Sequence, residues 1–129
     1  MRISRVSILA VALLGFAPQA HSAMGFDALY NRMENRLLSA CGPNVVCKER
    51  LAPFLRFVWE NREKRNMKVL LAKCTAKTAL KRGYVMRPTR VFNDMSPAGA
   101  QSIASDVCDC TVGDWAAQVC EPLNTPLPL

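Results

Sequence analysis

Histidine is almost missing from this 129-residue sequence, whose single residue of this type is His21. His21 falls in an N-terminal segment that we expect to be removed, so the remaining chain has no imidazole. This excludes Ser-His-Asp catalysis and zinc sites built with histidine ligands. Any chemistry in the mature chain would have to come from carboxylate, lysine, tyrosine or cysteine side chains.

Common catalytic and nucleotide-binding motifs are also missing. The sequence contains no GxSxG, no P-loop, no glycine-rich dinucleotide turn and no HExxH. Among the acidic residues, Asp106 and Asp109 share one face of a predicted helix, which leaves a small carboxylate-based hydrolase as one alternative function. Surface helices carry such pairs routinely, however. We therefore expect a protein that is not an enzyme and has no cofactor and no metal site.

The first 23 residues are typical of a secretory signal peptide. Arg2 and Arg5 precede an apolar run from Val6 to Ala17, and small residues follow Pro18. The run is about 12 residues long, whereas a helix needs ~20 residues to span a bilayer. The pattern predicts cleavage near residue 23 and a mature chain located in the periplasm or secreted.

All six cysteines lie beyond this segment, and an even number in a short exported chain predicts three disulfides. A cysteine-only zinc site would need paired CxxC spacings, which the sequence does not have. Cys108 and Cys110 are one residue apart, so we expect them to pair with different partners. Our predicted pairs are Cys41–Cys47, Cys74–Cys108 and Cys110–Cys120.

Apolar residues recur at helical spacing along the mature chain, and no useful strand-like alternation is present. This predicts an all-α fold, a small bundle of four to five short helices stapled by three disulfides. Residues 24–121 would form one helical domain, and 122–129 an extended proline-rich tail. The expected helical segments are 27–40, a stripe at 51–58, 67–83, a helix from 97 to Cys108 and a short helix through 115–120.

Local signals place several helix ends. Gly42-Pro43 stops the first helix, and Ser96-Pro97 provides a capping serine followed by proline at the first helical position. The apolar stripes at 51–58 and 67–78 do not share one phase. We therefore expect the chain to bend near Arg65-Asn66.

Charge is sorted along the sequence more strongly than the formal net charge of +7 suggests. From Lys48 to Arg90 there are 13 basic and three acidic residues, whereas 91–129 contains five acidic residues and no basic ones. Lys73, Lys77 and Lys81 follow one another at i,i+4, where like charges repel one another in an isolated helix. The central third of the chain is therefore predicted to carry a strongly basic face.

Three interpretations of this face remain open. It is a solvated surface partly neutralised by the acidic C-terminal third, a docking surface for an acidic protein, or a contact with an anionic polymer or lipid surface. We favour a non-enzymatic binding or accessory role, with a toxin or a subunit of an envelope secretion or conjugation complex as partner and no nucleic acid. The candidate partner-binding residues are Trp59, Arg62, Lys64, Arg65, Lys68, Lys73, Lys77 and Lys81.

Overall fold

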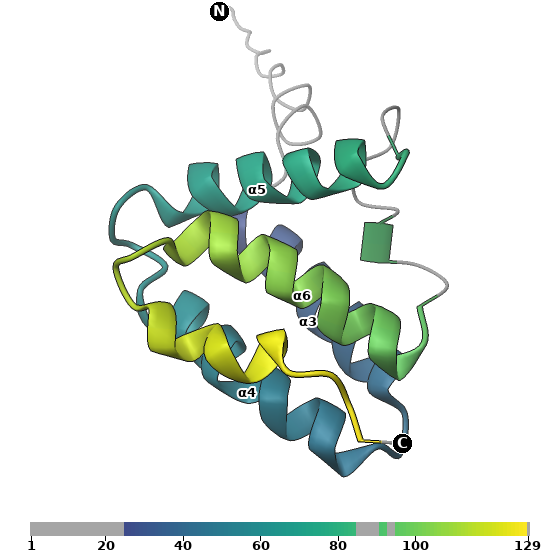
Figure 1. The fold of residues 1–129 in the computed structure, drawn as a ribbon. Helices are drawn as coiled ribbons and strands as arrows, with labels where there is room; N and C mark the ends of the chain where they lie inside the picture. The colour runs from purple at the N-terminus through teal and green to yellow at the C-terminus, as the bar shows by residue number, and fades with distance from the viewer. Residues whose placement is uncertain (1–24, 85–90, 93–94, 129) are drawn as a thin grey trace, which may run out of the picture.

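The computed structural model describes residues 25–84, 91–92 and 95–128, and in these ranges all regular structure is helical. The predicted all-α fold with three disulfides is confirmed. The predicted signal peptide at residues 1–23 lies outside the described residues, as do residues 85–90 and 93–94. Figure 1 shows the elements α3 (Phe26–Cys41), α4 (Val45–Glu60), α5 (Met67–Lys81), α6 (Pro97–Val112), η2 (Ala117–Val119) and η3 (Glu121–Asn124).

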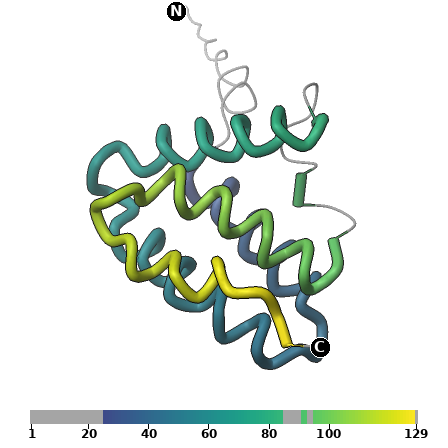
Figure 2. Tube along the Cα trace, viewed as in Figure 1, coloured from purple at the N-terminus to yellow at the C-terminus, as the bar shows by residue number. Residues whose placement is uncertain are grey.

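Helix α6 is the centre of the arrangement. It packs against α3, α4 and α5 and against both short 3-10 turns that follow it. Figures 1 and 2 show α6 crossing the middle of the molecule with α5 along one edge and α4 along the opposite one. The residues that fill the space between α3, α4 and α6 are fully buried and apolar, and they include Met33, Leu37, Leu51, Phe54, Val58, Ala104 and Val107.

Several predicted helix ends are confirmed. The Ser96 side chain accepts a hydrogen bond from the backbone N–H of Gly99, and Pro97 occupies the first turn of α6. Gly42 ends α3 with a positive φ of 56°, which glycine adopts without steric cost. Arg65 and Asn66 both have left-handed backbone angles, so the chain bends between α4 and α5 where the change of phase predicted it.

Helix α4 begins earlier than the apolar stripe at 51–58 predicts. Asn44 caps it by accepting a hydrogen bond from the backbone N–H of Cys47 at 2.9 Å, and the helix runs from Val45. The apolar stripe does not extend to this first turn of α4 because Val45 faces solvent. Pro53 consequently lies inside the helix, where it removes one backbone donor.

Two of the three predicted disulfide pairs are wrong. The structure joins Cys41 to Cys47, as predicted, but Cys74 to Cys110 and Cys108 to Cys120. Residues two apart on a helix point in nearly opposite directions, because each residue turns the helix by about 100°. Cys110 therefore faces α5, while Cys108 faces the turns that follow α6.

The end of the chain is more ordered than predicted. No α-helix forms after Gly113; a short 3-10 turn at Ala117–Val119 replaces the expected helix. Residues 122–124, expected to be extended, belong to η3, and Leu123 is buried. Beyond them, Arg50 donates hydrogen bonds to the backbone oxygens of Thr125 and Pro126, at 2.6 and 2.8 Å. These bonds hold the extended segment against α4.

Candidate docking surface

The predicted basic residues lie along one edge of the molecule, in the α4–α5 connector and on α5 (Figure 1). We call this set the basic surface. Its lysines and Arg65 are exposed, and Arg62 is half-buried. The basic surface comprises Arg62, Lys64 and Arg65 in the connector and Lys68, Lys73, Lys77 and Lys81 on α5.

Two arginines of the basic surface are held by tryptophans. The guanidinium of Arg62 lies 4.2 Å from the centre of the Trp59 ring, and that of Arg65 lies 4.2 Å from the centre of the Trp115 ring. Such cation–π contacts contribute about 0.5–1 kcal/mol at exposed sites. Trp59 is 39% exposed and also contacts Tyr30, with ring centres 5.2 Å apart. The connector therefore presents positive charge from ordered side chains.

Trp115 is a residue that sequence reasoning missed as part of this surface. It lies about half-buried after α6 and meets Phe57 of α4 edge to face, with ring centres 4.8 Å apart. Its contact with Arg65 joins residues far apart in the sequence. No local pattern signals such a pair, since only the packing of α4 on α6 brings it about.

Among the described residues, the acidic C-terminal third neutralises only the Lys81 end of the basic surface. The Asp106 carboxylate lies 3.5 Å from Lys81 Nζ and 3.0 Å from Arg82 Nη2, so Lys81 is partly neutralised. Among the described residues, Lys64, Lys68, Lys73 and Lys77 have no carboxylate within ion-pair distance. The pKa of Asp109 is raised, first by burial and then by the nearby Asp106 charge. Most lysines of the basic surface therefore have no counter-charge nearby among the described residues.

The carboxylate pair proposed for a hydrolase has another explanation in the structure. Asp106 is bound to Lys81 and Arg82, and Arg82 also donates to the Ser102 hydroxyl at 2.8 Å. These contacts tie the end of α5 to α6, which is a structural task. In the described part of the chain, no cluster of histidine, cysteine or acidic residues is arranged to hold a metal ion.

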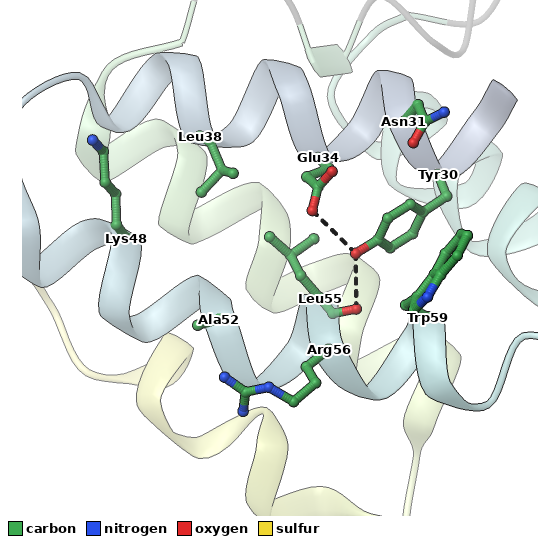
Figure 3. A pocket seen from close by; sticks show the side chains of 9 residues that line it. All are labelled: Tyr30, Asn31, Glu34, Leu38, Lys48, Ala52, Leu55, Arg56 and Trp59. Carbon is green, nitrogen blue, oxygen red and sulfur yellow. Dashed lines mark hydrogen bonds between the residues drawn. The ribbon is translucent and has the colours of Figure 1, made fainter. Parts of the chain in front are cut away.

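A hollow lies between α3 and α4, and Figure 3 shows it from close by. It has a volume of about 430 Å³, with Trp59 at one end and Lys48 at the other. The Tyr30 hydroxyl lies 3.1 Å from the Leu55 carbonyl oxygen and 3.3 Å from Glu34 Oε2. Burial, followed by the Glu34 charge, raises the pKa of Tyr30 to about 12. Tyr30 is thus a neutral phenol that joins α3 to α4.

Large apolar side chains on the outside of α5 were not predicted as part of the site. Val69 is 62% exposed and Leu80 is 63% exposed, near opposite ends of the helix. Both lie among the lysines of the basic surface. Their exposure was not apparent in the sequence because α5 has apolar residues on all sides, and only its packing against α6 decides which of them are buried.

No protein-family model, curated protein or solved structure matches this chain. Within the described ranges, every helix falls short of the length and hydrophobicity that crossing a membrane requires. The function has to be inferred from the basic surface and its geometry.

Proposed function

We propose that this chain is a non-enzymatic, exported binding or accessory protein that docks an acidic protein through the basic surface. One observation carries the proposal: Lys64, Lys68, Lys73 and Lys77 lie on one edge and have no carboxylate partner among the described residues. Charges arranged in this way steer an oppositely charged partner and raise its association rate.

The connector supplies the second part of the interface. Tryptophan and arginine are among the residues most enriched at binding hot spots. Here Trp59, which is 39% exposed, stacks with the half-buried Arg62. Because the stack already orders both side chains, binding loses less side-chain entropy. The acidic partner would be a toxin or a subunit of an envelope secretion or conjugation complex.

Export is part of the same proposal. A signal peptide at residues 1–23 would deliver the chain to the periplasm or the exterior, where disulfides form and persist. The three disulfides leave no free cysteine in the described residues, which suits an oxidising compartment. The localisation is tested by the mass of the protein recovered from the envelope fraction, which would match cleavage near residue 23 and six oxidised cysteines.

The docking proposal is tested by affinity capture from the native envelope fraction, with two triple variants of equal net charge. One variant replaces Lys68, Lys73 and Lys77 by glutamine. The matched control replaces Arg32, Arg36 and Lys48 by glutamine, and these three residues are exposed on α3 and α4. We expect wild type and control to capture the same acidic protein and the first variant to lose it, with capture weakening as salt rises.

Equal capture by both triple variants would contradict the proposal. The alternative is a cationic protein that binds a membrane or a polyanion, and the exposed Val69 and Leu80 among lysines favour it. Retention on heparin or on anionic vesicles at physiological salt, together with no captured acidic protein, would replace our proposal by this alternative.

A further inference from the structure

Helix α5 is covered on one side only among the described elements. Its principal neighbour is α6, toward which Met67, Leu71 and Cys74 point from its buried face. The other helices of the bundle each pack against at least two elements. In Figures 1 and 2, α5 accordingly forms one edge of the described part of the molecule.

The open side of α5 carries an apolar stripe. Val69, Ala72, Ala76 and Leu80 are all exposed, and helical geometry places them within a sector roughly 80° wide. Val69 and Leu80 are about 16 Å apart along the axis, because each residue adds ~1.5 Å. Two large exposed apolar side chains therefore mark the ends of a straight strip about three turns long.

Lysines border this stripe on both sides. Lys73 and Lys77 lie along one border and Lys68 along the other, all exposed and without an ion-pair partner among the described residues. This charge selects the occupant. A second copy of this chain would bring lysines against lysines, whereas an acidic partner would bring carboxylates against them.

We propose that the open side of α5 docks one amphipathic acidic helix of the partner protein, lying along α5. Apolar side chains of that helix would contact Val69 and Leu80, and its acidic side chains would pair with Lys68, Lys73 and Lys77. This deepens the proposed function and rests on it. A hollow of about 580 Å³ between α5 and α6, bordered by Leu80, Lys77 and Asp109, has room for one large side chain of the incoming helix.

A helix suits this strip better than a lipid surface does. Helices that lie in a membrane interface have a broad apolar face with aromatic or leucine side chains. The open side of α5 offers two large apolar residues and two alanines. Alanines in the middle of the strip allow the backbone of a second helix to approach closely, as helix pairs packed ~8–10 Å apart require.

The probe is a designed peptide helix with leucines on one face, spaced to meet Val69 and Leu80, and glutamates on the flanks. Binding to the full mature chain is measured by fluorescence anisotropy. We expect Val69→Ser with Leu80→Ser to weaken binding at least tenfold, since each loses buried apolar contact. Val45→Ser, at an equally exposed valine of α4, is the matched control and leaves binding unchanged.

The lysine variant tests the charge that this inference shares with the proposed function, and the Val69 and Leu80 variant separates the two. Replacing Lys68, Lys73 and Lys77 by glutamine should weaken peptide binding at least tenfold and flatten its salt dependence. A peptide with the glutamates replaced by lysines should not bind. Circular dichroism of each variant checks that the helices remain folded.

Two results would overturn the inference in different ways. If the lysine variant loses the peptide and the native partner but the Val69 and Leu80 variant keeps both, the basic surface docks by charge alone and the helix proposal falls. If the peptide does not bind while anionic phospholipid vesicles do, with loss on the same apolar substitutions, the open side of α5 contacts lipid and the helix proposal falls. The docking proposal falls as well if no acidic protein is captured.

Discussion

Helix α5 and the pair formed by α3 and α4 are attached to the central helix α6 in different ways. Helices α3 and α4 contact α6 and also each other, and they supply ten of the 25 buried apolar residues in the described ranges. Helix α5 relies on one helix interface, the Cys74–Cys110 disulfide and the contacts of Lys81 and Arg82 with Asp106. The α-helix that carries most of the basic surface is thus the one with the fewest neighbouring elements among the described residues, and binding elements commonly have few neighbours.

The difference explains where each kind of residue is found. In α3 and α4 the buried residues are large and apolar, such as Met33, Leu37 and Phe54. In α5 two threonines, Thr75 and Thr78, are buried beside Met67, Leu71, Cys74 and Ala79. Threonine and alanine bury less apolar surface than the large side chains of α3 and α4, so α5 gains less free energy from packing, because burial contributes about 25 cal/mol per Å². The Cys74–Cys110 disulfide adds stability that the packing of α5 does not provide.

The disulfide pairing is the sharpest test of this comparison, because its outcome is all-or-none. A protease that cuts before aspartate, applied to the denatured, unreduced protein, separates Cys108 from Cys110 at Asp109 and Cys120 from both at Asp114. We expect mass spectrometry to find the peptide with Cys110 joined to the one with Cys74. A peptide joining Cys108 to Cys74 would contradict the covalent link we describe.

Removing the link to α5 should have the largest effect on stability. The Cys74–Cys110 disulfide closes a sequence separation of 36 residues, and Cys41–Cys47 one of 6. Chain-entropy arguments give about 4 kcal/mol for the first loop and about 2 kcal/mol for the second. We expect replacing both Cys74 and Cys110 by alanine to lower the free energy of unfolding by more than replacing Cys41 and Cys47.

Hydrogen exchange identifies which helices lose stability when the Cys74–Cys110 disulfide is removed. Without the Cys74–Cys110 link, amides of α5 should lose protection first, while those of α3 and α4 keep most of theirs. The Cys41 and Cys47 variant is the control, since its disulfide joins α3 to the first turn of α4. Equal loss of protection in all helices would show that α5 unfolds together with the core.

On the α3–α4 side, Tyr30 provides a contact that depends on pH. Its pKa is raised from 10 to about 12, mainly by burial, so the folded state keeps the proton to higher pH than the unfolded state. The contribution of protonated Tyr30 to the free energy of unfolding is complete below pH 10, falls as the pH rises toward 12 and is lost above pH 12. At ~1.4 kcal/mol per pKa unit the loss is roughly 3 kcal/mol.

Tyr30→Phe checks this prediction. The variant loses the hydrogen bond to the Leu55 carbonyl and should be about 1 kcal/mol less stable at neutral pH. Urea unfolding of both proteins from neutral to alkaline pH gives the difference in free energy, in which other titrating groups cancel. The wild-type advantage should shrink between pH 10 and 12, and a constant difference would contradict the role of burial.

Sequence patterns predicted the helices well because their ends depend on local chemistry. Ser96-Pro97 and Gly42 act within one turn of their own positions, so their effect is visible in the sequence. The pairing of Cys108 and Cys110 is different, since it depends on which neighbour of α6 each one faces. The sequence showed that they have separate partners, but it could not show which.

In the candidate site, too, features that are visible in the local sequence were predicted, and features that depend on helix packing were not. The lysines of α5 were predicted because charge is visible in the sequence and exposed in almost any fold. The Arg65–Trp115 stack, the exposure of Val69 and the ion pair that partly neutralises Lys81 were not predicted. Each depends on the packing of α4 or α5 against α6, which no local pattern reports.

The smallest effect concerns the contact between α5 and Asp106. Its ion pairs with Lys81 and Arg82 are partly exposed, and such pairs contribute about 0–1 kcal/mol. Asp106→Asn should therefore lower the free energy of unfolding by less than about 1 kcal/mol. It should also strengthen binding of the acidic peptide, since Lys81 and Arg82 lose their counter-charge. The pKa of Asp109 should fall, because the Asp106 charge is one of the two causes that raise it.

Asp114→Asn is the matched control for this change, because it alters the net charge equally at an exposed carboxylate that makes no ion pair among the described residues. Peptide binding by the two variants is compared by anisotropy, and the pKa of Asp109 is followed by carboxyl NMR. If charge acts through the basic surface, only Asp106→Asn strengthens binding appreciably. If both variants strengthen it equally, the peptide responds to overall charge and the location of the lysines on α5 is not what selects it.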